Sequence, residues 1–191
     1  TNHGMQVFGG HGFIREWGME QLVRDCRIAP IYEGTNGIQA LDLLGRKVLG
    51  SQGKLLRGFT KIVHKFCAAN AGHPHLASYV AQLNALNQQW GELTTQVGMA
   101  AMKNPDEVGA ASVDYLMYSG YIILGYLWLR MALVAQAQLD SGSGDADYCQ
   151  GKLATNEFYF KRLLPRTAAH RAAIEAGSDC LMKLPAEIFA L

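Results

Sequence analysis

Glu33 is the acidic residue whose surroundings best suit a general base. It follows the apolar pair Ile31-Tyr32, precedes Gly34 and has no basic residue four positions away on either side. Apolar surroundings disfavour the charged form of a carboxylate and raise its pKa, which suits proton abstraction near neutral pH. An acid here also suits a helix start, where the helix dipole favours negative charge. The spacing alone leaves both interpretations open.

Two glycine-bearing segments lie on either side of Glu33 in the sequence. Residues 9–12 (GGHG) follow a short apolar segment, and residues 34–37 (GTNG) open a predicted helix. A helix start preceded by glycine and threonine offers free backbone N–H groups to an anionic ligand such as a phosphate. A glycine near a helix start is also an ordinary structural feature, so this pattern alone does not identify a ligand.

The remaining metal-ligand and thiol types form no recognisable site in the sequence. His73-Pro74-His75 has no third ligand nearby, so we expect a solvated turn and no metal. The four cysteines are widely separated and form no CxxC pair. We predict reduced, mostly buried thiols; a disulfide in a secreted protein is the alternative.

Composition excludes some classes of protein. The 191 residues carry 17 basic and 16 acidic side chains, a net charge of +1, and 49% are hydrophobic. No basic block indicates a nucleic-acid partner. Residues 115–129 are uncharged and apolar, but this run is shorter than the roughly 20 residues that span a bilayer. We therefore predict no membrane span and a helix buried in a bundle, with a membrane-bound variant as the alternative.

Apolar residues recur every three or four positions through most of the chain, which predicts helices. Glycine is concentrated before residue 58, so the first part is expected to be rich in loops. No alternating strand pattern occurs, and the predicted class is an all-α antiparallel helix bundle. The expected helices span residues 35–48, 54–71, 76–97, 105–140 and 149–164, with a break at Pro165 and a last helix to about residue 183.

The stretch from Gln6 to Arg46 resembles the acyl-CoA dehydrogenases. Its motifs are QVFGGHGF, LVRD, IYEGT and IQ at matching distances, over about forty residues without a gap. The resemblance implies that Glu33 abstracts the α-proton of an acyl-CoA thioester. It also implies FAD contacts through Gln6, Gly9 and Gly10, made to the FAD of a neighbouring subunit, and through three residues of the following helix start. These three residues are Thr35, Asn36 and Gly37, and Gly34 is expected at the substrate.

The sequence departs from the family pattern at Gly37, where many members have Glu or Gln. A side-chain contact to the flavin is therefore not expected from this position, whereas a backbone contact is. Arg24 and Asp25 match an R-D pair in the family that we interpret as structural. His11 stands where many members have Asn, and we predict no more than a ligand neighbour there.

The implied reaction converts acyl-CoA to trans-2-enoyl-CoA with FAD as cofactor and an electron-transfer flavoprotein as electron acceptor. The long sequence after Glu33 resembles a branch with an extra C-terminal helical domain, which includes the 3-methylmercaptopropionyl-CoA dehydrogenases and related bacterial fatty acyl-CoA enzymes. We predict the end of the catalytic helical domain at residues 1–50 and the extra helical domain at residues 51–191.

The resemblance also bears on the state of the protein. We expect the chain to be part of a longer enzyme that is a homodimer or tetramer, and to be inactive alone. A bacterial cytoplasmic location is expected, with the mitochondrial matrix as the alternative. The competing hypothesis is a non-catalytic helical module for oligomerisation or docking, because residues 50–191 contain no constellation of acids, nucleophiles or metal ligands.

Overall fold

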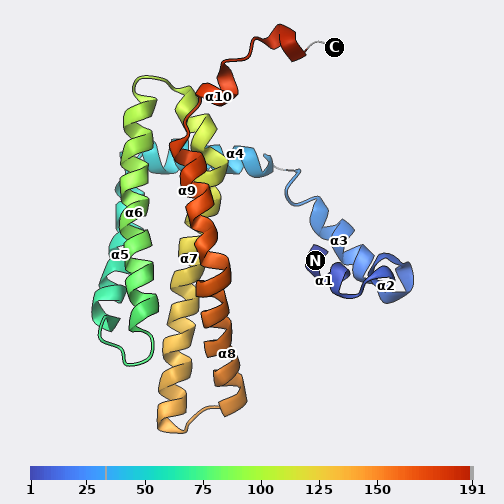
Figure 1. Cartoon of the computed structure of the whole chain (residues 1–191), viewed down its shortest axis with the longest axis vertical. Coiled ribbons are helices and arrows are strands. Elements are labelled where there is room, and N and C mark those ends of the chain that lie inside the picture. Colours follow the sequence, from blue (N-terminus) through green and yellow to red (C-terminus); the bar gives the residue numbers. More distant parts are fainter. Residues whose placement is uncertain (33, 190–191) are drawn as a thin grey trace. The chain divides into compact units, whose positions relative to one another are not determined.

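The computed structural model describes residues 1–32 and 34–189, and every regular element within these residues is helical. This confirms the predicted all-α class. The chain divides into two compact units, Thr1–Gln39 and Ala40–Leu191. Each unit is described by itself below (Figure 1).

The N-terminal unit is built from short helices. The prediction of a loop-rich start is wrong here, because the glycines separate helices that follow one another closely. Gly9 and Gly18 have φ angles of 59° and 73°, a left-handed backbone that glycine adopts without steric cost. The helices of this unit are α1 (Asn2–Val7), α2 (Gly10–Phe13), the 3-10 turn η1 (Arg15–Trp17) and α3 (Met19–Arg27).

Helices α1 and α2 approach each other most closely at Gly12, which is buried. A Cβ atom on Gly12 would lie 2.2 Å from the Met5 carbonyl oxygen and 2.9 Å from the Phe8 Cβ. By contrast, a Cβ on Gly10 would meet nothing within 4 Å. The close packing of these two helices therefore depends on the absence of a side chain at Gly12.

The C-terminal unit is an antiparallel helix bundle, as predicted, in which long helices run up and down side by side (Figure 1). Helix α7 is its centre, because α6, α8 and α9 all pack against it. The elements are α4 (Thr35–Leu41, which begins before the unit boundary), the π-helix η2 (Asp42–Leu49), α5 (Lys54–Asn70), α6 (Ala77–Ala101), α7 (Asp106–Ser141), α8 (Ala146–Phe158), the π-helix η3 (Tyr159–Leu163), the 3-10 turn η4 (Leu164–Arg166), α9 (Thr167–Glu175), α10 (Asp179–Met182) and the 3-10 turn η5 (Ala186–Phe189).

Helix α7 starts and stops where its sequence signals predict. Pro105 is its N-cap, and Asp106 and Glu107 place negative charge in the first turn, where the helix dipole favours it. Gly142 ends the helix in a left-handed conformation with φ 65°. Glu107 also holds the far end of the chain, since the Ser178 hydroxyl donates a hydrogen bond of 2.6 Å to its carboxylate.

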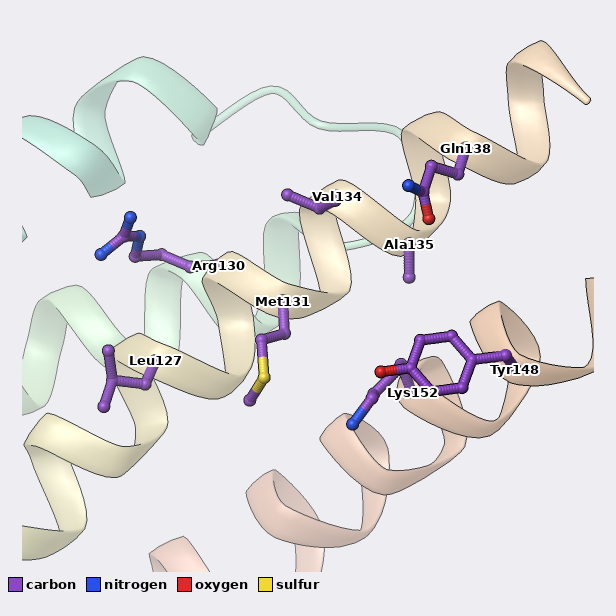
Figure 2. A pocket seen from close by; sticks show the side chains of 8 residues that line it. All are labelled: Leu127, Arg130, Met131, Val134, Ala135, Gln138, Tyr148 and Lys152. Atoms are coloured by element: carbon purple, nitrogen blue, oxygen red, sulfur yellow. The ribbon is translucent and has the colours of Figure 1, made fainter. Parts of the chain in front are cut away.

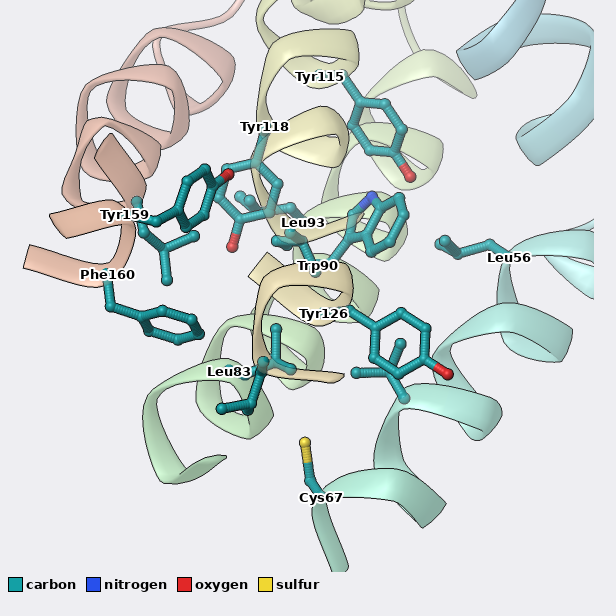
Figure 3. Close-up of a cluster of buried hydrophobic side chains, with 14 of the residues drawn as sticks. Leu56, Cys67, Leu83, Trp90, Leu93, Tyr115, Tyr118, Tyr126, Tyr159 and Phe160 are labelled. Atoms are coloured by element: carbon teal, nitrogen blue, oxygen red, sulfur yellow. The ribbon is translucent and has the colours of Figure 1, made fainter. Parts of the chain in front are cut away.

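Large aromatic side chains fill the core between these helices (Figure 3). Tyr115 and Tyr118 of α7 are fully buried, and both hydroxyls have partners on α6. The Tyr115 and Thr94 hydroxyls lie 2.6 Å apart, and the Tyr118 hydroxyl donates to Gln89 at 2.7 Å. Burial raises the pKa of Tyr115 to about 12, so this hydroxyl stays neutral in the folded protein at physiological pH.

Several boundaries differ from the sequence prediction. The helix predicted over residues 35–48 continues through η2 with wider π-type turns, and Gly50 N–H donates to Gly45 C=O at 2.8 Å. The break at Pro165 is confirmed as a 3-10 turn. The last helix ends at Glu175 and not near residue 183, because Gly177 turns the chain with φ 72°.

The prediction that most of the thiols are buried holds for two of the four cysteines. Cys67 and Cys149 are buried, whereas Cys26 and Cys180 are exposed. All four are free thiols. Burial raises the pKa of Cys67 to about 11, which makes it a poor nucleophile at neutral pH.

Helix α7 is buried on one side only, which corrects the expectation that it is enclosed by the bundle. Ile122 and Leu129 are fully buried, whereas Leu124 and Leu127 are 48% and 41% exposed. By length and composition α7 could cross a membrane, and 28% of its apolar window is buried. The same helix carries buried polar groups, including Ser119, whose hydroxyl donates to Tyr115 C=O at 2.7 Å.

Replacing Ile122 by alanine tests the position of the core. The side chain is 0% exposed, so its loss should lower the free energy of unfolding by about 2–5 kcal/mol through lost burial and a residual cavity. Ile62, which is 54% exposed on α5, is the matched control, and Ile62→Ala should cost less than about 1 kcal/mol. Denaturant unfolding followed by circular dichroism measures both; equal losses would contradict this core.

Replacing Gly12 by alanine tests the close approach of α1 and α2. The new methyl group would collide with the Met5 carbonyl, at a cost of about 1–3 kcal/mol if the backbone shifts to accommodate it. Hydrogen exchange of the α1 and α2 amides should therefore accelerate. Gly10→Ala is the control, since the space around Gly10 is open. Unchanged protection in the Gly12 variant would show that the two helices are not packed in this way.

Candidate functional site

The predicted base, Glu33, lies outside the described residues. The structure does describe the residues before and after it. Tyr32 precedes it and is half exposed. Gly34 and Thr35 follow with φ angles of 100° and 52°. A positive φ at a β-branched residue such as Thr35 is a genuine outlier that costs free energy. Backbone strain of this kind clusters at active sites and ligand clamps, so it supports a functional role for this turn.

Gln6, Gly9 and Gly10 lie together where α1 ends and α2 begins. Gly9 N–H donates to the Gln6 carbonyl at 3.0 Å, which closes the end of α1. All three residues are exposed, and a Cβ on Gly9 or Gly10 would meet nothing within 4 Å. The chain therefore presents bare backbone and the free side-chain amide of Gln6 on one exposed turn.

Thr35, Asn36 and Gly37 form the first turn of α4. The Thr35 hydroxyl lies 3.5 Å from the Ile38 N–H, at the outer limit of a hydrogen bond, and accepts weakly from it. Thr35 and Asn36 are exposed. Gly37 is half-buried, and a Cβ there would make ordinary contact with the Thr35 hydroxyl at 3.9 Å. The backbone N–H groups of this turn point along the helix start, where an anionic group is favoured.

These residues fit the polar contacts of a dinucleotide such as FAD. Glycine backbone, an amide side chain and a helix start are donor types that bind phosphate and hydroxyl groups. Within the part of the chain that the structure describes, no hydrogen bond links the turn at Gly9 to the first turn of α4. The structure therefore presents two separate exposed turns with such donor groups.

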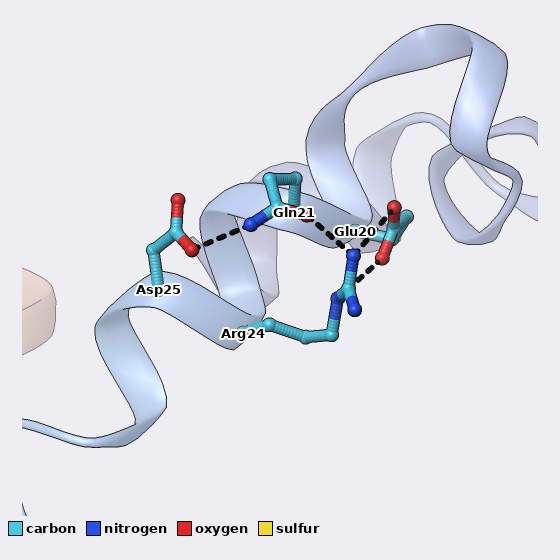
Figure 4. A network of polar contacts seen from close by, with 4 residues as sticks. All are labelled: Glu20, Gln21, Arg24 and Asp25. Atoms are coloured by element: carbon cyan, nitrogen blue, oxygen red, sulfur yellow. Dashed lines mark hydrogen bonds and ion pairs between the residues drawn. The ribbon is translucent and has the colours of Figure 1, made fainter.

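Arg24 and Asp25 belong to a chain of polar contacts along α3 (Figure 4). Arg24 Nε lies 2.8 Å from the Glu20 carboxylate, and its guanidinium also donates to Gln21. The Gln21 amide in turn donates to Asp25 at 2.6 Å. All of these pairs link successive turns of one helix, which agrees with a structural role. Because Arg24 is exposed, each contact contributes little to stability.

His11 contacts the aromatic ring of Trp17 edge to face, with ring centroids 5.2 Å apart. Trp17 also meets Phe8 edge to face at 6.1 Å. The three rings form a small exposed cluster beside the turn at Gly9. The ring contact gives His11 a structural partner, and no group of three His, Cys, Asp or Glu residues that could hold a metal ion occurs among the residues described.

Sequence reasoning missed a groove of about 470 Å³ in the C-terminal unit, between α7 and α8 (Figure 2). Leu127, Met131 and Val134 line one side of it, and Tyr148 and Lys152 face them from α8. None of the residues predicted to form the catalytic site lines this groove. The signal that could have found it is the spacing of the apolar α7 residues by four and three positions.

Comparison with known families accounts for both parts of the chain. The family model described as "Acyl-CoA dehydrogenase, C-terminal domain" matches residues 1–49, and the model described as "Acetyl-CoA dehydrogenase C-terminal like" matches residues 59–185. The second match alone covers more than half of the chain. Residues 50–58, which include the start of α5, lie between the two matches.

Similar proteins include several acyl-CoA dehydrogenases. The chain is 37% identical over 184 residues to 3-methylmercaptopropionyl-CoA dehydrogenase of Ruegeria pomeroyi, covering 94% of this chain and 30% of that protein. It is 35% identical over 193 residues to the broad-specificity linear acyl-CoA dehydrogenase of Mycobacterium tuberculosis, covering 97% and 32%.

A shorter match, 44% identical over 41 residues, is to a subunit of the caffeyl-CoA reductase–Etf complex of Acetobacterium woodii, covering 22% of this chain and 11% of that subunit. The chain spans about a third of the length of its two long relatives. With family models matching both its N-terminal and its C-terminal segments, the chain belongs to the acyl-CoA dehydrogenase family.

Proposed function

We propose that this chain is the C-terminal helical part of a flavin-dependent enzyme that converts acyl-CoA thioesters to trans-2-enoyl-CoA. The observation that carries the proposal is the match of two acyl-CoA dehydrogenase C-terminal models to residues 1–49 and 59–185. The strained turn at Gly34 and Thr35 supports it independently, since it follows directly after the proposed base. In this proposal residues 51–191 form an additional helical domain.

Glu33 is the proposed catalytic base. Its carboxylate removes the α-proton of the thioester, and its backbone N–H donates a hydrogen bond to the thioester carbonyl. The α-proton is a very weak acid, so the negative charge that develops on the carbonyl oxygen must be stabilised as the proton leaves. Gly34 and Thr35 fix the direction of the backbone after the base, and Gly34 is the residue proposed to lie at the substrate.

The cofactor-binding residues in the proposal are Gln6, Gly9 and Gly10 on one turn and Thr35 to Gly37 on the other. Bound FAD would accept the β-hydrogen of the substrate as hydride. Gln6 binds through its exposed amide, and Gly9 and Gly10 bind through backbone that no side chain covers. Asn36 contributes its N–H group at the α4 start, and Gly37 contributes backbone only. Thr35 contributes its exposed side-chain hydroxyl, because its own N–H donates to the Tyr32 carbonyl at 3.3 Å.

The proposed partners follow from the same reaction. The substrate is an acyl-CoA, and an electron-transfer flavoprotein is the proposed acceptor of the electrons. The match to a subunit of a caffeyl-CoA reductase–Etf complex supports this choice of acceptor. Proposed cofactor contacts to a neighbouring subunit imply a homodimer or tetramer. We place the enzyme in the bacterial cytoplasm.

A non-catalytic role in oligomerisation or docking is the second candidate function for the extra helical domain. The exposed apolar side of α7 favours it, since Leu124 and Leu127 are almost half exposed there. The two functions are compatible in one enzyme, because the proposed catalytic residues all precede Ala40.

Glu33→Gln in the complete enzyme tests the proposed base. Amide replacement keeps the side-chain shape but cannot accept the α-proton, so the rate of anaerobic flavin bleaching by acyl-CoA should fall by at least about 10²–10⁴. FAD content should be unchanged. Glu16→Gln is the control, because Glu16 is an exposed acid in the same N-terminal unit. The control variant should bleach its flavin at the wild-type rate. Rapid bleaching in the Glu33 variant would show that another residue is the base.

The chain alone should neither bind FAD stoichiometrically nor oxidise acyl-CoA. A cofactor site buries most of its ligand, whereas Gln6, Gly9, Gly10 and Thr35 are exposed here and supply only part of an enclosure. Gel filtration of residues 1–191 with excess FAD, followed by flavin absorbance of the protein peak, measures this. An equimolar flavin content would overturn the expectation and show that these residues form a complete site.

A further inference from the structure

A side chain of α4 covers the residue that follows the proposed base. Ile38 comes four positions after Gly34. In a helix, each side chain tilts toward the N-terminus and covers the turn that precedes it. The Ile38 Cγ2 methyl accordingly lies 3.0 Å from the place that a Cβ on Gly34 would take, and the Ile38 Cβ lies 3.4 Å from it. Ile38 therefore packs directly on the backbone of Gly34.

This contact gives Gly34 two separate reasons to be glycine. Its φ angle of 100° belongs to a left-handed backbone that residues with side chains rarely adopt. A Cβ at this position would also meet the Ile38 methyl at 3.0 Å, which is closer than the optimal separation of two carbon atoms. Gly34 and Ile38 thus fit together as a pair, because the methyl group fills the space that the missing side chain leaves.

The hydrogen bonds of this turn are long. Thr35 N–H donates to the Tyr32 carbonyl at 3.3 Å, and this bond links the residue before Glu33 to the second residue after it. Ile38 N–H donates to the Thr35 hydroxyl at 3.5 Å, the outer limit of a hydrogen bond. Thr35 meanwhile has a φ angle of 52°, which is costly for a β-branched residue. Such a conformation persists only where the surrounding structure enforces it, so packing has to support these weak bonds.

Isoleucine is well suited to give this support. β-branched side chains in a helix mostly keep one χ1 rotamer, so the Cγ2 methyl has a fixed place relative to the helix backbone. Ile38 is 55% exposed, and its side chain therefore adds little to a buried core. The contact with Gly34 is the packing that its branched shape serves.

We propose that Ile38 is a positioning residue for the proposed base. Its Cγ2 methyl packs on Gly34 and holds Gly34 and Thr35 in their left-handed conformations, so that the backbone leaves Glu33 in one fixed direction. Proton abstraction needs a base held at the reacting carbon, and a displacement of about 1 Å can slow a reaction roughly 100-fold. Ile38 acts through the backbone and needs no contact with the substrate. The inference rests on the proposed function of Glu33.

Ordinary packing at a helix start is the alternative explanation of the contact. The proposed flavin contacts Thr35, Asn36 and Gly37 lie on the same turn as Ile38, so a general weakening of α4 would lower the FAD content of the enzyme. A positioning role instead slows proton abstraction while the FAD content and the affinity for acyl-CoA stay the same. Measuring the rate together with these two quantities separates the explanations.

Ile38→Ala in the complete enzyme tests the proposal. Anaerobic flavin bleaching by acyl-CoA should slow by roughly 10–100-fold, with unchanged FAD content and an unchanged acyl-CoA concentration for half-maximal rate. Ile38→Val keeps the Cβ and a Cγ2 methyl over Gly34 and should retain the wild-type rate. Ile14→Ala is the control, because Ile14 is 44% exposed in the same unit. A wild-type rate in Ile38→Ala, a valine variant as slow as the alanine variant, or a slow alanine variant that has lost its FAD would overturn the proposal.

Hydrogen exchange of the Thr35 amide provides a second measurement that does not need the reaction. Ile38→Ala should accelerate this exchange several-fold, because the bond to the Tyr32 carbonyl loses its support, whereas Ile38→Val and Ile14→Ala should not. Mass spectrometry of the complete enzyme with electron-transfer fragmentation resolves the single amide. Unchanged Thr35 exchange in Ile38→Ala would overturn the positioning role. A wild-type enzyme that no acyl-CoA bleaches would overturn the proposed function itself, and the two failures are thereby told apart.

Discussion

The fold depends on the burial of one side of α7. Tyr115, Tyr118, Ile122 and Leu129 on that side are fully buried, and α6, α8 and α9 all pack against the helix. Aromatic residues bury large apolar areas, but each tyrosine hydroxyl then needs a hydrogen-bond partner inside the protein. Thr94 and Gln89 supply partners to Tyr115 and Tyr118, so the polar groups as well as the apolar area fix α6 against α7.

Much of the bundle could be predicted from the sequence, because the ends of its helices are marked by particular residue types. The start of α7 at Pro105 and its end at Gly142 depend on backbone conformations that particular residue types favour. The stop at Gly177 depends on the same property of glycine, but an alanine-rich sequence around it favours helix strongly enough to hide the signal. The wider π-type turns of η2 have no counterpart in the residue types of 42–49, which are compatible with an ordinary α-helix.

The candidate site, unlike the bundle, could not be predicted from residue types alone. The residue types around Glu33 left both a general base and a helix-start acid open, and only the family resemblance favoured the base. The positive φ of Thr35 could not be predicted from its side chain, because β-branched residues disfavour this conformation. The glycines of the N-terminal unit also separate short helices and, at Gly12, allow two of them to touch.

The two sides of α7 differ in burial, and each side has its own consequence. A helix needs one apolar stripe to join a bundle, and α7 has that stripe through Ile122 and Leu129. On its other side Leu124 and Leu127 are almost half exposed, and an exposed apolar patch of this kind marks a contact surface. The bundle therefore buries one side of α7 in its core and leaves the other side available for contact.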